Sequence, residues 1–372
     1  MMNRFLFCVT RSIVSMLLVL TCSSLYGQIL HGVPRSVQSR TLDMSMPLTE
    51  PSLETGTTTL NIYMVNWNPY KSPCSSVLMR YEPLTSFGDL PEQADTVIDK
   101  FGQASFSFQQ TGTCKVQLFF TEDYSTSCFY LYPGEHAKVF IDMEKLVAGN
   151  KLRKSAYSDM RMYRTGSLPN GFENRKLMEP DYDFADSSCV WFSGKYANLN
   201  MAIHRYVPWG NLTGWDEKKE LLLATHQSLK QSYSTDLRKW YEEQRDRVEN
   251  DERMPLCLKQ LVETKLSLLC FEYWQMNLYQ LLLDERKNDG SNEGAVKKPL
   301  RLTGEQKEFV RSLQLNTSLT GYFRECHSLV HLDDVLYDFL VQKSPCNVLR
   351  WLCKNRDADT GRSGHHIYII RE

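Results

Sequence analysis

Cysteine is the residue type in this chain with the most obvious chemical potential. The sequence holds eleven cysteines, two of them within the first 27 residues, and no pair is spaced as Cys-x-x-C. Thiol–disulfide exchange needs a thiolate of lowered pKa with a second thiol close by, usually as Cys-x-x-C at a helix N-terminus. The closest pair, Cys346 and Cys353, would be separated by about 10 Å along a helix, too far for a disulfide. The spacing argues against a catalytic dithiol and leaves Cys346, with a thiol supplied by a partner, as the redox alternative.

Three further residues have the types found in metal sites. Cys326 is followed by His327 and His331, and two histidines four residues apart share one face of a helix. A zinc site needs further ligands, and no other residue has diagnostic spacing. The chain also lacks the G-x-S-x-G, H-E-x-x-H and phosphate-binding glycine motifs. A metal-binding protein or hydrolase using Cys326, His327 and His331 is therefore a second alternative, and the sequence predicts no catalytic residue and no cofactor.

Two aromatic clusters could serve recognition instead of catalysis. Trp191 and Phe192 form the first, and Tyr206 and Trp209 belong to the second. Clustered aromatic side chains are typical of the centre of a protein interface. They are equally typical of a core between two domains, which is the commoner role. We take these four residues as candidate partner-binding residues, with burial as the competing interpretation.

The N-terminus predicts export. Arg4 and Arg11 give a positively charged start before the apolar run 13–20, and mostly small or polar residues lead to Gly27. This is the pattern of a signal peptide cleaved after Gly27. Processing as a lipoprotein at Cys22 is the alternative, although Thr21 fits that motif poorly. We expect a protein of the periplasm or cell envelope, where an oxidising environment permits one or two disulfides.

Charge and hydropathy restrict the partners. The formal net charge is −1, whereas proteins that bind nucleic acid usually carry a concentrated basic surface. No later apolar run approaches the ~20 residues of a membrane helix. The sequence thus predicts an envelope protein partner, no nucleic acid and no integral span after cleavage.

Short alternating segments between residues 58 and 147 predict strands. In 104–108, for example, Ala104, Phe106 and Phe108 fall on one face and serines on the other. Turns rich in Gly, Pro and Asp separate these segments, as in an antiparallel sandwich. Similar strands are predicted at 58–65, 75–81, 95–99, 114–120, 127–131 and 136–142.

The second half of the chain has helical spacing. Helices are predicted from 194, from 215 to about 248, over 255–286, from 303, and over 320–343. The fold class is therefore α+β, an N-terminal antiparallel β-sandwich followed by an all-helical domain. The expected divisions are a signal peptide (1–27), a lead-in segment (28–57), the β-sandwich (58–150), an irregular insertion (151–193), the helical domain (194–345) and a tail (346–372).

Two motifs carry a family resemblance. Tyr132–Pro133–Gly134–Glu135 follows Leu131 and leads into the strand Val139–Phe140–Ile141–Asp142, and Gly194–Lys195–Tyr196–Ala197–Asn198–Leu199–Asn200 opens the helical part. Over residues 58–345 the chain resembles exported TlpA-like proteins of the thioredoxin family from Bacteroides and relatives. In that group a "Leu-x-Pro-Gly-Glu" turn feeds a strand of the form "Val-x-Ile-Asp".

The resemblance implies a thioredoxin domain with W-C-x-x-C at the end of the chain, and the sequence departs from it there. Ser344–Pro345–Cys346 is only similar to part of that motif, and the Trp and first cysteine have no counterpart. We therefore expect a non-catalytic relative, with 346–372 as a tail or thioredoxin remnant. Its expected role is binding or assembly in the cell envelope.

Overall fold

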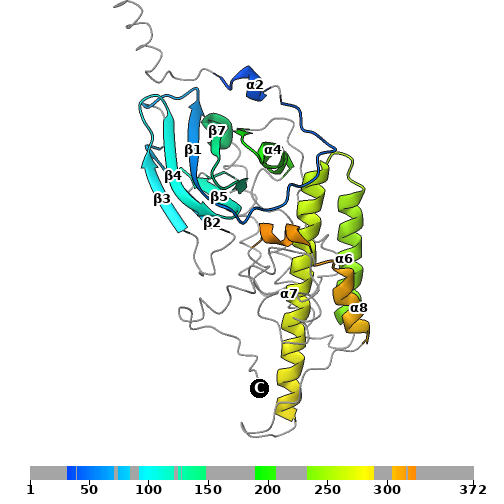
Figure 1. Cartoon of the computed structure of the whole chain (residues 1–372). Coiled ribbons are helices and arrows are strands. Elements are labelled where there is room, and N and C mark those ends of the chain that lie inside the picture. Colours follow the sequence, from blue (N-terminus) through cyan, green and yellow to red (C-terminus); the bar gives the residue numbers. More distant parts are fainter. Residues whose placement is uncertain are drawn as a thin grey trace, which may run out of the picture.

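The computed structural model describes residues 32–38, 40–70, 74–83, 92–120, 125–126, 128–147, 189–206, 233–288, 304–315 and 317–323. The fold is α+β: two four-stranded sheets occupy the N-terminal half and the long helices come later in the chain (Figure 1).

The first sheet is built around the long strand β1 and has the order β4-β1-β7-β8. Its strands are β1 (Thr55–Val65), β4 (Gln103–Thr111), β7 (His136–Asp142) and β8 (Val190–Ser193). β1 pairs antiparallel with β4, placing Leu60 opposite Phe106, but it pairs parallel with β7, placing Leu60 opposite Ala137. The expectation of antiparallel pairing is thus wrong for β1 and β7. Sequence alternation fixes which face a side chain occupies but not the direction of its neighbouring strand.

The second sheet has the order β3-β2-β5-β6 and every pairing within it is antiparallel. Its strands are β2 (Ser76–Pro83), β3 (Glu92–Val97), β5 (Cys114–Phe119) and β6 (Phe129–Leu131).

One buried cluster receives side chains from both sheets. Leu60, Ile62 and Met64 of β1 belong to it together with Val77 of β2 and Val116 of β5. The predicted alternation in β4 is confirmed, since Ala104 and Phe106 are buried while the intervening serines are exposed. Period-two alternation places one face of each strand in this core.

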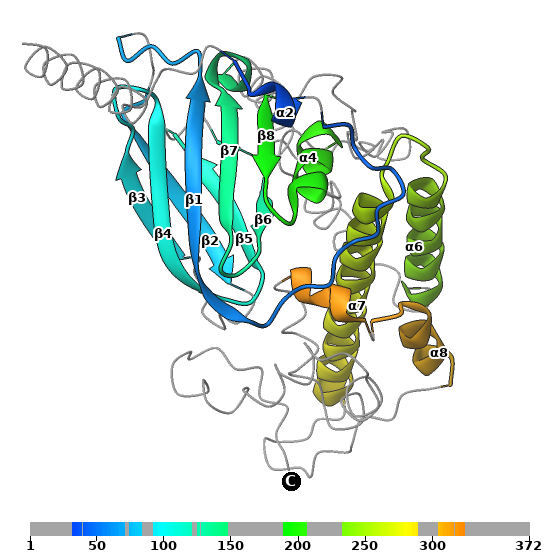
Figure 2. The ribbon, with the colours of Figure 1, turned by 45° about the horizontal axis from the view of Figure 1, so that its top comes forward.

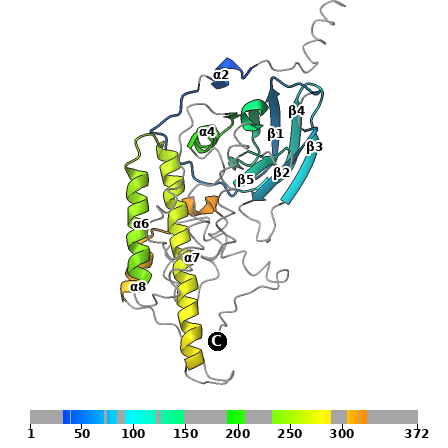
Figure 3. The same cartoon turned by 180° about the vertical axis from the view of Figure 1, so that it is seen from behind.

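The helices of the described residues include α2 (Arg35–Gln38), α4 (Ala197–Tyr206), α6 (Tyr233–Glu249), α7 (Leu256–Asn288) and α8 (Gly304–Ser312), with a 3-10 turn, η2, at Ser318–Tyr322. The long helices α6 and α7 lie side by side, joined by a short connection, and α8 lies beside α6 (Figures 2 and 3). The helix predicted over 255–286 is confirmed as α7, because Leu258, Leu261 and Leu269 recur at helical spacing and are buried.

α4 stands between the sheets and the long helices. Ala197 and Met201 face the core of the sheets, whereas Leu199 and Ile203 belong to a second core formed by the helices. Tyr130 of β6 is also part of this second core. The two cores are therefore joined through α4 and β6.

Part of the segment predicted as an irregular insertion is a strand. Val190, Trp191 and Phe192 are buried in β8, which pairs antiparallel with β7. The remainder of that segment up to 188 lies outside the described residues, as do the start of the helix predicted from 215 and all residues after 323.

Candidate functional site

The turn between β6 and β7 is the centre of the best-defined polar site in the described chain. Gly134 has a φ of 76°, a left-handed conformation that suits glycine. The Thr58 hydroxyl accepts a hydrogen bond from the Gly134 amide at 3.0 Å and fixes the turn against β1. The chain then places Glu135 beside the connection that leads into α4.

Glu135 joins the two sequence motifs. Its carboxylate accepts hydrogen bonds from the main-chain amides of Tyr132 at 2.8 Å and Lys195 at 2.9 Å. The Lys195 ammonium lies over the Tyr132 ring, 3.4 Å from its centroid. Burial raises the pKa of Glu135 above its ordinary value, while the two amide hydrogen bonds oppose this shift.

Gly194 makes this contact sterically feasible. Its φ of 126° is one that L side chains rarely adopt, and a Cβ there would lie 2.7 Å from a Glu135 carboxylate oxygen. Gly194, the first residue of the second motif, thus leaves space for Glu135, the last residue of the turn in the first motif.

Asn200 of α4 completes the edge of β6. Its side-chain oxygen accepts from the Tyr130 amide at 2.8 Å, and its side-chain amide donates to the Tyr130 carbonyl at 2.8 Å. This is the pair of hydrogen bonds that a neighbouring strand would make. The buried asparagine therefore satisfies main-chain groups at a sheet edge inside the molecule.

Tyrosine rings pack around this edge. Tyr130 and Tyr322 meet edge to face with centroids 4.9 Å apart, and Tyr196 lies 5.9 Å from Tyr322. The Tyr196 hydroxyl is 2.9 Å from that of Thr113. Burial raises the pKa of Tyr196 and of Tyr322, so both phenols remain neutral hydrogen-bonding groups.

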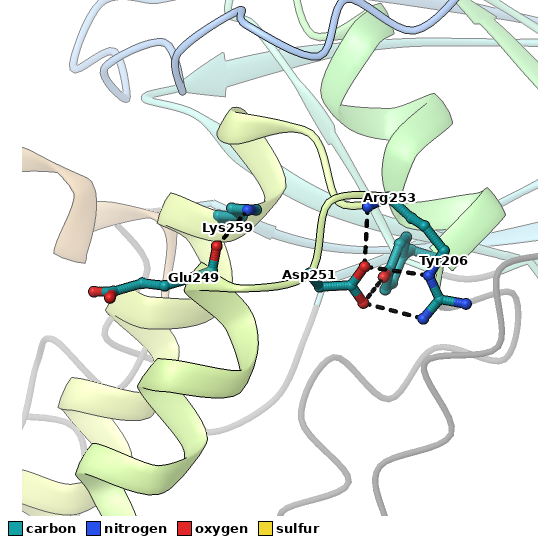
Figure 4. Close-up of polar contacts among 5 residues, drawn as sticks. All are labelled: Tyr206, Glu249, Asp251, Arg253 and Lys259. Carbon is teal, nitrogen blue, oxygen red and sulfur yellow. Dashed lines mark hydrogen bonds and ion pairs between the residues drawn. The ribbon is translucent and has the colours of Figure 1, made fainter.

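A second polar cluster connects the end of α4 with the α6–α7 connection (Figure 4). The Tyr206 hydroxyl donates to Asp251, whose carboxylate also accepts from the Arg253 guanidinium at 3.1 and 3.2 Å. Burial acts to raise the pKa of Asp251, but the hydrogen bonds from Arg253 and Tyr206 outweigh it and lower the pKa. Nearby, Lys259 of α7 donates to the Glu249 carbonyl at 2.7 Å. The hydrogen bond between the neutral Tyr206 phenol and the ionised Asp251 carboxylate therefore links the end of α4 to the α6–α7 connection.

The aromatic residues predicted to bind a partner are core residues where they are described. Trp191 is 8% exposed, Phe192 1% and Tyr206 0%. Phe129 and Phe192 rings pack 5.1 Å apart, centroid to centroid, inside the core of the sheets. The prediction of an exposed contact surface is therefore corrected for these three residues, because packing removes them from solvent. Trp209 lies outside the described residues.

The described cysteines are not arranged for redox chemistry. No disulfide joins any two of the six in the described ranges, and Cys114, Cys257 and Cys270 are buried. Burial raises the pKa of Cys114 and Cys270, and it raises the pKa of Cys189 and Cys257 to about 11. A raised pKa disfavours the reactive thiolate.

Cys326, His327, His331 and Cys346 all lie outside the described residues. Within the described ranges, no group of three or more His, Cys, Asp or Glu side chains is placed to hold a metal ion. No helix in those ranges combines the length and apolar character required to cross a bilayer.

Sequence reasoning missed the importance of Glu135 and Asn200 as individual side chains. One signal was available for Asn200, an amide between Leu199 and Met201 on a helix with little polar surface. Buried amides need partners, so such a residue predicts a specific contact.

A scan against protein-family models found no matching model. Searches among curated proteins and solved structures likewise produced no match.

Proposed function

We propose that the chain is an exported, non-catalytic binding or assembly protein of the cell envelope, related to the TlpA-like group of the thioredoxin family. Within this proposal, the two sheets are a β-sandwich and the residues from 194 onward an all-helical domain.

One observation carries the proposed relationship. The two motifs that resemble the TlpA-like group lie 60 residues apart in sequence, yet Glu135 of the first accepts from the Lys195 amide of the second. Asn200 of the second motif pairs with the main chain of Tyr130, just before the first. Motif residues that depend on each other physically are better support for a shared architecture than two separate matches would be.

The non-catalytic part of the proposal is supported by the cysteines and the polar clusters of the described residues. The described cysteines for which a pKa shift is resolved are all shifted upward, away from the reactive thiolate. The described polar clusters use their side chains to satisfy main-chain groups and to fasten helices. Trp209 remains the proposed partner-contact residue, since the other three aromatic candidates are buried.

The decisive experiment combines an activity assay with partner capture. We expect the mature chain and its Cys346→Ser variant to be equally inactive in insulin reduction. After cross-linking in intact cells, the tagged chain should retain a discrete envelope partner, and Trp209→Ala should lose it.

Tyr70→Ala is the matched control, because Tyr70 is an aromatic residue that is 96% exposed and lies far from Trp209 in the sequence. Insulin reduction that disappears in Cys346→Ser would contradict the proposal and favour the redox alternative. Retention of the partner by Trp209→Ala would remove Trp209 as the contact residue.

A further inference from the structure

The segment from Asp43 to Ser52, here called the strap, begins with a turn at Met44–Ser45 and runs past α4 and α7 before the chain enters β1 (Figure 2). It has no helix or strand of its own. Its main-chain groups therefore need partners from elsewhere in the chain.

The first half of the strap is held by α4 and the start of α7. The Asn198 side chain accepts from the Asp43 amide at 2.9 Å and donates to the Asp43 carbonyl at 3.2 Å. The Leu256 amide donates to the Met44 carbonyl at 2.9 Å. The Asn198 side chain thus pairs with the main chain of the strap as a neighbouring strand would.

The second half is held by α7, η2 and the β4–β5 turn. Gln260 accepts from the Leu48 amide at 2.7 Å, and the Tyr322 hydroxyl donates to the Thr49 carbonyl at 2.5 Å. Thr113 accepts from the Ser52 amide through its hydroxyl, at 2.8 Å, and donates its own amide to the Ser52 carbonyl at 2.9 Å.

These contacts have a common property. Apart from the Ser52 hydroxyl, which accepts from the nearby Glu54 amide at 3.1 Å, the hydrogen bonds between the strap and the rest of the described chain engage the strap's main chain. Six of the ten strap residues are exposed, whereas Leu48, Pro51 and Ser52 are buried, Leu48 in the helical core at 7% exposure. The five residues that hold the strap, Thr113, Asn198, Leu256, Gln260 and Tyr322, form what we call the strap site. It recognises the strap's main chain and its buried apolar residues Leu48 and Pro51, as peptide-binding sites do.

We propose that the strap site binds an extended peptide in trans, and that its partner is the strap of a second copy of this chain. The strap fits this site within its own chain, and every copy of the chain carries the same strap sequence. Only Leu53 and Glu54 separate the strap from β1, so exchange between copies would preserve the contacts of the strap itself. The hinge contacts would change, since Glu54 accepts from the Gly112 amide at 2.8 Å and from the Tyr132 hydroxyl at 3.2 Å. The inference rests on the assembly role proposed above and names its partner.

Binding in trans must compete with the chain's own strap, which is present at a high effective concentration. The test therefore weakens the strap and leaves the strap site intact. A fluorescein-labelled peptide of residues 40–54 is added to the mature chain carrying Leu48→Asp, and binding is measured by fluorescence polarisation. We expect the variant to bind the peptide at least tenfold more tightly than the unaltered chain does.

Two controls examine the strap site and Leu48. The same peptide carrying Leu48→Asp should bind at least tenfold more weakly. Adding Asn198→Ala and Gln260→Ala to the Leu48→Asp chain should also weaken binding of the unaltered peptide. Circular dichroism confirms folding, and Leu48→Ala replaces Leu48→Asp if the latter does not fold.

The choice of partner is tested on the unaltered chain. Copies labelled with donor and acceptor dyes are mixed at high concentration, and energy transfer should appear and be suppressed by excess peptide. Equal binding of both peptides, or no saturable binding to the folded variant, overturns the proposal. Peptide binding without energy transfer between copies overturns the second copy as partner. Neither result depends on Trp209 or on the cross-linked partner, so failure here is distinct from failure of the proposed function.

Discussion

At the scale of single residues, Glu135 is a half-buried carboxyl that organises main-chain amides. It holds the β6–β7 turn and the start of α4 through the amides of Tyr132 and Lys195. Burial raises its pKa more than these hydrogen bonds lower it. Ionisation of Glu135 therefore lowers the stability of the folded protein. Its two carboxyl oxygens are nevertheless needed as acceptors for the amides of Tyr132 and Lys195.

This balance predicts a pH dependence of stability. A carboxyl whose pKa is raised on folding contributes most below its ordinary value of 4.5, and that contribution declines as pH rises through the folded pKa. Relative to Glu135→Gln, the unaltered chain should therefore lose free energy of unfolding as pH is raised from 4 to 7. Urea unfolding of both proteins across this range measures the difference. Glu308→Gln, in the exposed part of α8, controls for general effects of removing a carboxylate. The assignment would be contradicted if the free energy of unfolding of the unaltered chain rose with pH relative to that of Glu135→Gln.

At the scale of secondary-structure elements, α4 is the helix that positions the others. One face packs on the sheets and another on the long helices, and its polar side chains reach both β6 and the strap. The connection from β8 into α4 passes through Gly194, where conformation and space both favour glycine. Small changes here should therefore affect the whole junction.

Gly194→Ala should destabilise the protein by about 1–3 kcal/mol, because it combines an unfavourable φ with a contact against Glu135. Gly304→Ala is the matched control: a Cβ at Gly304 meets nothing within 4 Å. Alanine there should be neutral or stabilising by up to about 1 kcal/mol. Thermal unfolding of the two variants provides the comparison, and equal midpoints would contradict the role given to Gly194.

Asn200→Ala should cost at least about 2 kcal/mol, since it leaves the buried amide and carbonyl of Tyr130 without this partner and each such group costs about 1–3 kcal/mol. Asn250→Ala makes the same chemical change at an exposed site, where the amide donates to the Asp246 carbonyl. Denaturant midpoints should separate the two variants clearly. Similar losses in both would show that the β6 edge gains little from Asn200.

At the scale of the whole molecule, the sheets and helices share their stabilising contacts. The strap contacts α4, α7, η2 and the β4–β5 turn, while Tyr130 belongs to the helical core although it lies in a strand. Interdependent parts of this kind unfold together in one cooperative transition.

We therefore predict that β1 and α7 lose hydrogen-exchange protection at the same urea concentration, measured by mass spectrometry on peptides from each element. Leu48→Ala should lower both midpoints together, because Leu48 is buried where strap and helices meet. Loss of protection in α7 well before β1 would indicate two independent units.

Local patterns in the sequence were sufficient for the elements themselves. Alternation predicted the strands from β1 to β7, and helical spacing predicted α7, because one face of each element must be apolar. The same patterns could not reveal that β1 and β7 run parallel, since strand direction depends on which distant segments meet.

The sequence by itself thus determined which residues of the alternating strands and of α7 turn inward, and it pointed to the two motifs that meet near the start of α4. Only the tertiary structure decided what those residues touch. Phe192 and Tyr206 were attractive as a binding surface until packing placed them in the cores. Glu135, Asn198 and Asn200 became important because they satisfy main-chain groups far away in sequence. The physical reason is that burial and hydrogen-bond pairing depend on long-range contacts, whereas periodicity records only the local side of each element.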